Sequence, residues 1–180
     1  MTDQSGHLLY NLNDESSWEE MDVTEKENVI LEDRVRKDWV DYNGHMNDSA
    51  YAFVFSIAVD RLMRKIGIDS RFRRERKYSM YTLETHLCYL RETLEAHPFR
   101  VTLQLLDYDD KRLHVFFVME NDDGVRLATS EQMLIGIDMT LRRSAPFPPP
   151  VMERIEALAK HDRFKPKPEE AGRVIGIKGK

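Results

Sequence analysis

The stretch from Ser49 to Ile66, SAYAFVFSIAVDRLMRKI, constrains the fold more than any other part of the chain. A surface helix would show a single apolar stripe, whereas the first three turns of this stretch are apolar on nearly every side. Asn47 or Asp48 can cap its start, and Gly67 stands where a helix-ending glycine is expected. The pattern therefore predicts a helix that is surrounded by protein. Its apolar residues are Ala50, Tyr51, Phe53, Val54, Phe55, Ile57 and Ala58.

Segments typical of β-strands precede and follow this helix. The stretch 29–40, VILEDRVRKDWV, holds enough β-branched residues to predict a first strand. The separators EAHP, DYDDK and NDDG have hairpin length, which favours antiparallel neighbours. We therefore expect an α+β fold in which a strand, a buried helix and a four-stranded meander form one curled antiparallel sheet around the helix. The four later strands, predicted from alternation of period two, are 81–90, 99–105, 113–119 and 125–137.

Composition favours one globular domain. The chain has 180 residues, of which 41% are hydrophobic and 33% are charged. A formal charge of −5 argues against nucleic acid as the main partner. Cys88 is the single cysteine, so no intramolecular disulfide and no thiolate metal site are expected. The acidic start resembles no signal peptide and no segment is apolar enough to span a bilayer, so we expect a cytoplasmic protein without a membrane partner.

The chain divides into three parts. Residues 1–28 are expected to form an acidic, partly disordered leader, and 29–150 the folded domain. Residues 151–180 are expected to hold a short helix, 151–160, and a basic tail that frays. Inside the domain, the run RFRRERK at 71–77 has five basic residues in seven and reads as a basic linker. It is either a solvated charge run or, through Arg73 and Arg74, a clamp for phosphates.

The stretch 39–51, WVDYNGHMNDSAY, crowds polar side chains ahead of the buried helix. Asn47 and Asp48 are favoured as helix caps. Asp41 can either cap a turn or supply a carboxylate for chemistry, and the pattern alone does not separate the two. Asn43 and His45 either brace the loop or support catalysis.

The pattern D-x-N-G-H-x-N-x-x-x-Y at the entrance of such a helix resembles the hotdog-fold acyl-CoA thioesterases, over roughly residues 29–150. Asp41 and Gly44, with Tyr51 ten residues after the aspartate, look like the signature of the 4-hydroxybenzoyl-CoA thioesterase group. In that family this aspartate is the catalytic carboxylate. The resemblance implies that Gly44, Asn47 and Tyr51 contact the substrate.

The triplet of Asp41, Asn43 and His45 is also similar to the catalytic triplet of plant acyl-ACP thioesterases. Those enzymes add a glutamate in a Y-x-R-E context, which Glu92 matches here at a longer spacing from His45. Four segments together look like the bacterial thioesterases of carnitine catabolism that hydrolyse betainyl-CoA. They are WVDYNGHMN, YTLETHLCYLRE, DDKRLHVF and ATSEQMLIGID, whereas the acidic leader and the Arg-rich run depart from that likeness.

These resemblances imply hydrolysis of a small acyl-CoA, with betainyl-CoA as the implied substrate and no cofactor or metal ion. Asp41 would act as base or nucleophile, and the start of the helix would polarise the thioester carbonyl. Aromatic side chains would face a quaternary ammonium group. The candidates are Trp39, Tyr42, Tyr51, Tyr81 and Tyr89.

A second copy of the chain is also expected, because a single curled sheet would leave its edges exposed. We expect a homodimer or a dimer of dimers whose sites are shared between chains. Glu84 and His86, which share one face of their strand, would then line the acyl site if that face meets a partner's groove. Two alternatives remain open: a non-catalytic acyl-CoA-binding hotdog protein and an acyl-ACP thioesterase.

Overall fold

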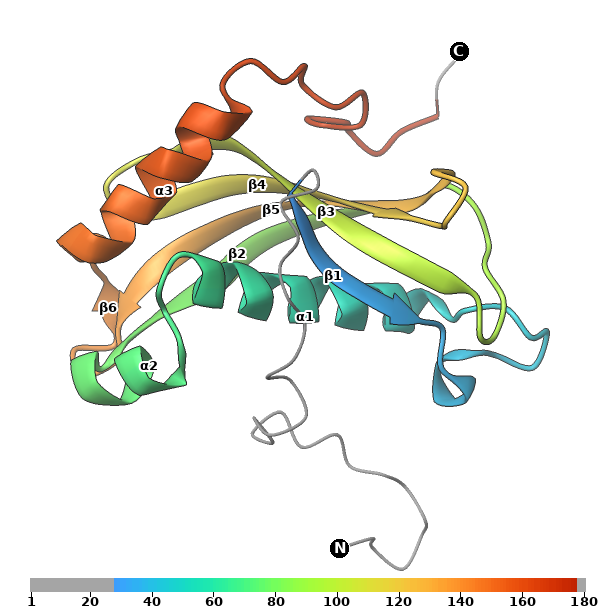
Figure 1. The fold of residues 1–180 in the computed structure, drawn as a ribbon, viewed down its shortest axis with the longest axis horizontal. Coiled ribbons are helices and arrows are strands. Elements are labelled where there is room, and N and C mark those ends of the chain that lie inside the picture. Colours follow the sequence, from blue (N-terminus) through green and yellow to red (C-terminus); the bar gives the residue numbers. More distant parts are fainter. Residues whose placement is uncertain (1–27, 178–180) are drawn as a thin grey trace, which may run out of the picture.

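A computed structural model describes residues 28–177, so the leader predicted for residues 1–28 lies outside the described residues except for Asn28. The elements follow one another along a single curved sheet with one long helix beneath it (Figure 1). They are β1 (Val29–Arg34), the short 3-10 helix η2 (Lys37–Trp39), α1 (Asp48–Lys65), α2 (Ser70–Arg76), β2 (Tyr78–Tyr89), β3 (Pro98–Tyr108), β4 (Arg112–Glu120), β5 (Arg126–Asp138), β6 (Arg143–Ser144) and α3 (Pro149–Asp162).

Helix α1 lies along the concave face of the sheet (Figure 1). Val54, Ala58 and Leu62 on α1 are completely buried, as are Val101 and Val115 on the strands above them. The predicted helix and the observed one differ by one residue at each end. The expected α+β fold, an antiparallel sheet curled around a buried helix, is confirmed.

The order of the strands across the sheet is β1-β3-β4-β5-β2, with every neighbouring pair antiparallel. The meander prediction is right for β3, β4 and β5 and wrong for β2, which pairs with β5. The segment 90–97 is therefore a crossover and not a hairpin. This crossover is held beside the residues that precede α1. The backbone oxygen of Thr93 accepts a hydrogen bond from the N–H of Met46 (2.9 Å), and the backbone oxygen of His97 accepts one from the N–H of Val35 (2.9 Å).

Two other local predictions are corrected. The strand predicted over 29–40 stops at Arg34, and η2 then turns Trp39 into the core. The run 71–77 is not a linker but mostly helix α2, because the side chain of Asp69 caps it by accepting a hydrogen bond from the N–H of Phe72 (2.7 Å). Phe72 then packs edge-on against Tyr78 at the start of β2.

Helix α3 covers the end of α1, where the side chain of Arg154 lies against Gly67. Residues 163–177, which we call the strap, then cross the sheet face opposite α1 (Figure 1). The prediction that this tail frays is wrong for residues 166–173, which are bound to three strands, whereas Val174, Ile175 and Ile177 are 82%, 86% and 84% exposed. On β3, Gln104 contacts Pro166 of the strap. On β5, Arg126 contacts Glu170 and Glu131 contacts Gly172. On β2, Cys88 contacts Arg173.

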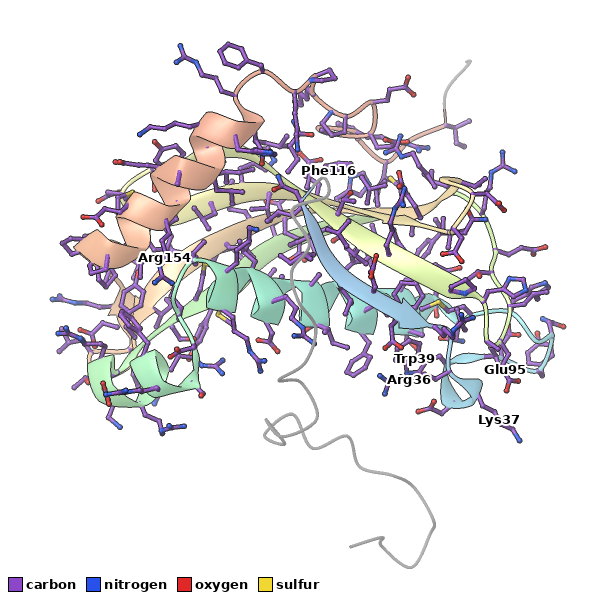
Figure 2. All side chains as sticks on the ribbon, viewed as in Figure 1. Arg36, Lys37, Trp39, Glu95, Phe116 and Arg154 are labelled. Atoms are coloured by element: carbon purple, nitrogen blue, oxygen red, sulfur yellow. The ribbon has the colours of Figure 1, made fainter. Side chains whose placement is uncertain are left out.

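Beneath the strap, Phe116 is buried although it points away from α1 (Figure 2).

Across residues 28–177, none of the helices combines the length and the apolar character that crossing a membrane requires.

Gly136 on β5 is expected to tolerate no side chain. A methyl group there would overlap the hydroxyl of Tyr78, which donates a hydrogen bond to the backbone oxygen of Ala145 (3.2 Å). Gly136→Ala should lower the free energy of unfolding in urea by about 1–3 kcal/mol, the usual cost of overpacking a tight site. Gly176→Ala, placed in open space, is the matched control, and equal effects of the two substitutions would contradict the packing argument.

Candidate active site

The loop ahead of α1 is organised by the side chain of Asp41. Its Oδ1 accepts hydrogen bonds from the backbone N–H groups of Asn43 (2.8 Å) and His45 (3.3 Å). The backbone closes the same turn, since Asp41 N–H donates to the oxygen of His45 (2.9 Å). In the described part of the chain, no hydrogen bond is made to Oδ2 of Asp41. The residue is thus a turn cap through one oxygen and keeps the other free.

Gly44 is required by the backbone of this loop. Its φ of +80° is in the left-handed region that favours glycine, and its N–H donates to the oxygen of Asp41 (3.0 Å). A Cβ added at Gly44 would meet nothing within 4 Å. Within one chain, backbone conformation rather than crowding therefore explains this glycine.

The crossover 90–97 brings Glu92 to this loop. Nε2 of His45 lies 3.4 Å from Oε2 of Glu92, and the side chains are 36% and 75% exposed. His45 also forms a β-bridge with Leu94, which fixes its backbone. Glu92 is a polar neighbour of the candidate site that the motif around residue 41 does not contain. Only its Y-x-R-E context gave a signal in the sequence.

The first turn of α1 follows directly. Asn47 is the N-cap: its Oδ1 accepts hydrogen bonds from the N–H (3.0 Å) and the hydroxyl (2.6 Å) of Ser49. Oδ1 of Asp48 also accepts from the Ser49 N–H (2.7 Å). The capping role predicted for Asn47 is confirmed, whereas Asp48 is the first residue of α1 and adds negative charge to its first turn. The N–H of Ser49 is engaged, and the N–H of Ala50 donates to the backbone oxygen of Asn47 (3.0 Å), so this helix start offers mainly its positive dipole end.

Two tyrosines stand beside this turn. The rings of Tyr51 and Tyr89 meet edge to face with centroids 5.5 Å apart, and the Tyr51 hydroxyl donates to the backbone oxygen of Arg91 (3.4 Å). Burial raises the pKa of Tyr51, and burial together with the charge of Asp48 raises the pKa of Tyr89. Both therefore remain neutral phenols at neutral pH. Tyr51 is 4% exposed and belongs to the core, whereas Tyr89 is 53% exposed and offers an aromatic face.

On its other flank, the first turn of α1 borders a cavity of about 480 Å³. Trp39 and Phe53, packed edge to face at 6.0 Å, form its apolar side. The Arg36 guanidinium lies 4.8 Å from the Trp39 ring centroid, and Figure 2 labels these two side chains next to each other. Sequence reasoning missed this cavity because η2, which positions Trp39, was taken for strand. Its lining residues are Asp38, Trp39, Val40, Asn47, Ser49, Ala50 and Phe53.

Other predicted site residues lie elsewhere in the single chain. Glu84 and His86 share the sheet face of Cys88 and Glu131, which the strap crosses, whereas α1 packs on the opposite face. A single chain therefore does not bring them to the Asp41 loop. They line an acyl site only if a second copy presents that face, and this stays a prediction.

Arg73 and Arg74 lie on α2, beyond the far end of α1 (Figure 1). An 18-residue helix spans about 27 Å, so about one helix length separates Arg73 and Arg74 from the Asp41 loop of the same chain. Arg73 instead lies near Asp60 on α1, where burial raises the pKa of the Asp60 carboxyl and Arg73 opposes that shift. The phosphate-clamp role of both arginines stays a prediction.

Among the described residues, no group of three or more His, Cys, Asp or Glu side chains is placed to hold a metal ion. The site instead combines a loop carboxylate with one free oxygen, an imidazole paired with a carboxylate, a helix start and two phenols. These groups can move a proton and stabilise a polarised carbonyl.

Known proteins share this fold. The thioesterase-like superfamily matches residues 35–155, which include the Asp41 loop, α1 and β2 to β5. The chain belongs to this superfamily. The hotdog fold and the resemblance read from the sequence are thereby confirmed.

Individual relatives are similar over most of the chain. Over 150 residues, 83% of this chain and 94% of the relative, it is 47% identical to the betainyl-CoA thioesterase of Pseudomonas aeruginosa. It is 37% identical to a Rhizobium meliloti L-carnitine dehydrogenase/betainyl-CoA thioesterase, of which it spans 30%. A Staphylococcus aureus protein solved in complex with CoA has a TM-score of 0.80 and 34% identity, covering 84% of this chain and 96% of that one. Together these findings support thioester hydrolysis of an acyl-CoA.

The capping role of Asn47 has a measurable consequence. Asn47→Ala removes the acceptor for the Ser49 N–H, and since Asp48 retains its own bond to that N–H, the free energy of unfolding should fall by about 1 kcal/mol or less. Asn47→Asp keeps an acceptor and should retain wild-type stability in urea unfolding. Asn43→Ala is the control, since no side-chain hydrogen bond of Asn43 is found in the described part of the chain. Equal losses at residues 43 and 47 would argue against the cap.

Proposed function

We propose that this thioester hydrolase acts on betainyl-CoA and releases the free acid and CoA, with Asp41 as the reacting carboxylate. The observation that carries the proposal is the Asp41 loop at the start of α1, with one carboxylate oxygen fixed and the other free. The P. aeruginosa relative named betainyl-CoA thioesterase supports the substrate. The reaction needs no cofactor, because coenzyme A arrives as part of the substrate.

In this mechanism the thioester carbonyl lies at the start of α1, whose positive dipole end favours the developing negative charge on oxygen. The free oxygen of Asp41 either takes a proton from the attacking water or attacks the acyl carbon itself. The C–S bond then breaks and the thiolate of CoA leaves. In the second route this leaves a mixed anhydride on Asp41, which a water molecule hydrolyses to release the acid and restore the carboxylate. His45, paired with Glu92, is placed to supply a proton in the same loop.

The acyl group of betainyl-CoA carries a quaternary ammonium, which aromatic faces and carboxylates attract. Of the five aromatic candidates from the sequence, Tyr51 and Tyr89 lie together beside the first turn of α1. Asp48 and Glu92 add negative charge on this side. Tyr42 is 97% exposed, and Trp39 already has a guanidinium against its ring. We therefore place the cationic acyl group against the exposed ring of Tyr89, which the buried Tyr51 supports edge to face.

A homodimer in the cytoplasm is part of the proposal. Among the described strands, β2 pairs only with β5, so its outer edge of 12 residues is open. Tyr81 and Leu83 are 53% and 58% exposed along this strand. A long, apolar, unpaired edge favours pairing with another strand, and a second copy of β2 offers a matching one. Tyr89 ends the same strand, so a partner there would stand next to the site.

The role of Asp41 can be separated from its capping role. Asp41→Asn keeps an oxygen for the N–H groups of Asn43 and His45 but cannot act as base or nucleophile. We expect kcat for betainyl-CoA in a thiol-release assay to fall by about 10²-fold or more with an unchanged melting temperature. Asp69→Asn, at the capping aspartate of α2, should leave kcat unchanged. Wild-type turnover in Asp41→Asn would reduce Asp41 to a turn cap, and tight CoA binding without turnover in the wild type would favour the non-catalytic binding protein.

Preference for a positive acyl group is tested with betainyl-CoA and its uncharged carbon isostere, tert-butylacetyl-CoA. The wild type should show a kcat/KM about tenfold higher for betainyl-CoA, the scale of a cation held against an aromatic face. Tyr89→Leu should reduce that ratio, whereas Tyr81→Leu, an equally exposed tyrosine on the same strand, should not. Equal kcat/KM values for both substrates in the wild type would show that the site does not recognise the charge.

A further inference from the structure

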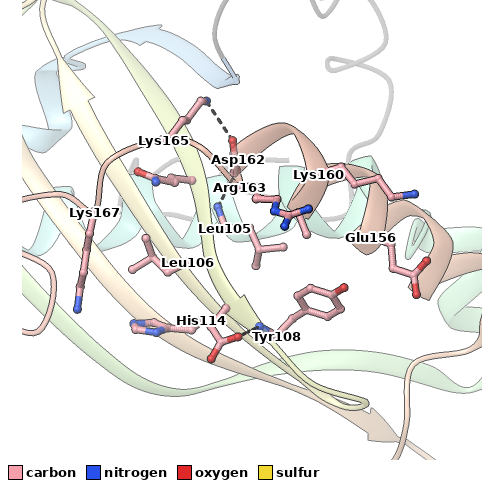
Figure 3. Close-up of a pocket in the computed structure, with 13 residues that line it drawn as sticks. Leu105, Leu106, Tyr108, His114, Glu156, Lys160, Asp162, Arg163, Lys165 and Lys167 are labelled. Carbon is pink, nitrogen blue, oxygen red and sulfur yellow. Dashed lines mark hydrogen bonds and ion pairs between the residues drawn. The ribbon is translucent and has the colours of Figure 1, made fainter.

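A second cavity, of about 690 Å³, lies far from the Asp41 loop. Its floor is formed by the ends of β3 and β4, where Gln104, Leu106 and His114 alternate with core residues and so point away from α1. The last turns of α3 and the start of the strap form its walls (Figure 3). Nothing in the mechanism of thioester hydrolysis uses this cavity.

The walls of the cavity are rich in positive charge. Lys160, Arg163, Lys165 and Lys167 all line it, although the whole chain carries a formal charge of −5. Lys165 is neutralised by Asp162, since Nζ of Lys165 lies 3.0 Å from Oδ1 of Asp162. In the part of the chain that the structure describes, no ion pair is formed by the other three cations, which outnumber the remaining lining carboxylates, Asp107 and Glu156.

Asp162 has no capacity to balance these cations as well. Its side chain is 1% exposed and already accepts hydrogen bonds from the N–H of Leu105 (2.8 Å) and from Nδ2 of Asn28 (2.7 Å). The second of these bonds places Asn28 at the rim of the cavity. The chain therefore enters the folded domain beside the cluster of cations.

The residues before Asn28 have the opposite charge. Residues 1–27 lie outside the described residues, and only their sequence enters here: they contain eight Asp or Glu residues and one lysine. The densest part, DESSWEEMD at 14–22, combines five carboxylates with Trp18. Carboxylates complement the Arg and Lys walls, and an indole complements the floor of Leu106 and Tyr108.

We propose that the stretch 14–22 docks in the cavity between α3, the strap and β3 of its own chain. The tether is short, since only five residues separate Asp22 from Asn28 and an extended chain spans about 3.3–3.6 Å per residue. Tethering also gives the stretch an effective concentration of the order of millimolar, which a free anion in solution would have to match. The observations thus favour this segment over a small phosphorylated ligand.

The test is zero-length carbodiimide cross-linking of the full-length protein at low ionic strength, with linked peptides identified by mass spectrometry. Carboxylates of residues 14–22 should link to Lys160, Lys165 and Lys167 about tenfold more often than to the exposed control residues Lys37 and Lys65. Raising the salt concentration to 0.5 M should remove most of this preference, because charge pairs on the surface are screened.

Charge-changing variants sharpen the test. The double variant Arg163→Glu, Lys167→Glu should reduce linking to Lys160 and Lys165 about tenfold, the same factor by which docking raises it. Lys37→Glu should leave linking unchanged, with the melting temperature of each variant checked against wild type. Mixing 15N-labelled and unlabelled protein separates docking within a chain, which gives uniformly labelled linked peptides, from docking between chains.

Two results would overturn the proposal. Linked peptides of mixed isotope content would assign the segment to a partner's cavity. Even linking to all lysines, together with a rise in melting temperature on adding pyrophosphate that the double variant lacks, would make the cavity a site for phosphate-bearing anions instead. Neither result depends on hydrolysis, so the proposed function stands or falls separately.

Discussion

Burial of α1 against the curved sheet is the interaction on which the rest of the molecule depends. Val54, Ala58 and Leu62 have no exposed surface, and full burial of a large aliphatic side chain contributes about 1.5–3 kcal/mol. The same burial fixes the direction of the helix. Its far end is covered by α2 and α3, whereas its first turn emerges beside the Asp41 loop. The core thus decides where the positive end of the helix dipole points.

The Asp41 loop shows how one residue can hold a turn and still keep an oxygen for the proposed chemistry. If the two N–H groups were shared between both oxygens of Asp41, neither oxygen would be left entirely for a substrate. If neither oxygen accepted an N–H group, the position of the carboxylate would vary with every motion of the loop. One fixed oxygen and one free oxygen meet both needs. The choice between cap and catalyst that the sequence posed is therefore not an exclusive one.

What the sequence could predict follows from which interactions are local. Helix α1 was predictable because consecutive residues of the sequence show its all-round apolar character. Its cap, Asn47, was predictable because caps act within three residues. The position of β2 was not, since alternation of period two is the same in an edge strand and in an inner one. For the same reason, alternation indicates that Glu84 and His86 share a face but not which face.

Contacts made by single side chains across long sequence distances were also beyond prediction. The approach of Glu92 to His45 depends on the crossover 90–97, whose length is that of a hairpin loop. The strap is polar and contains prolines, which are features of a free tail, yet isolated side chains such as Glu131 bind it. Such segments bury too little apolar surface to leave a periodic pattern in the sequence.

The two edges of the sheet differ in a way that bears on the proposed dimer. Strand β1 has six residues and carries Glu32, Asp33 and Arg34, so it is short and charged, as protected edges usually are. Strand β2 is twice as long, and its one irregularity, at Leu83, leaves that apolar side chain exposed. Its open edge ends at Tyr89, beside the first turn of α1. A strand added there by a second copy would cover the unprotected edge of β2 and form a wall next to the site. The proposed chemistry needs this side of the site to be enclosed, and a single chain leaves it open.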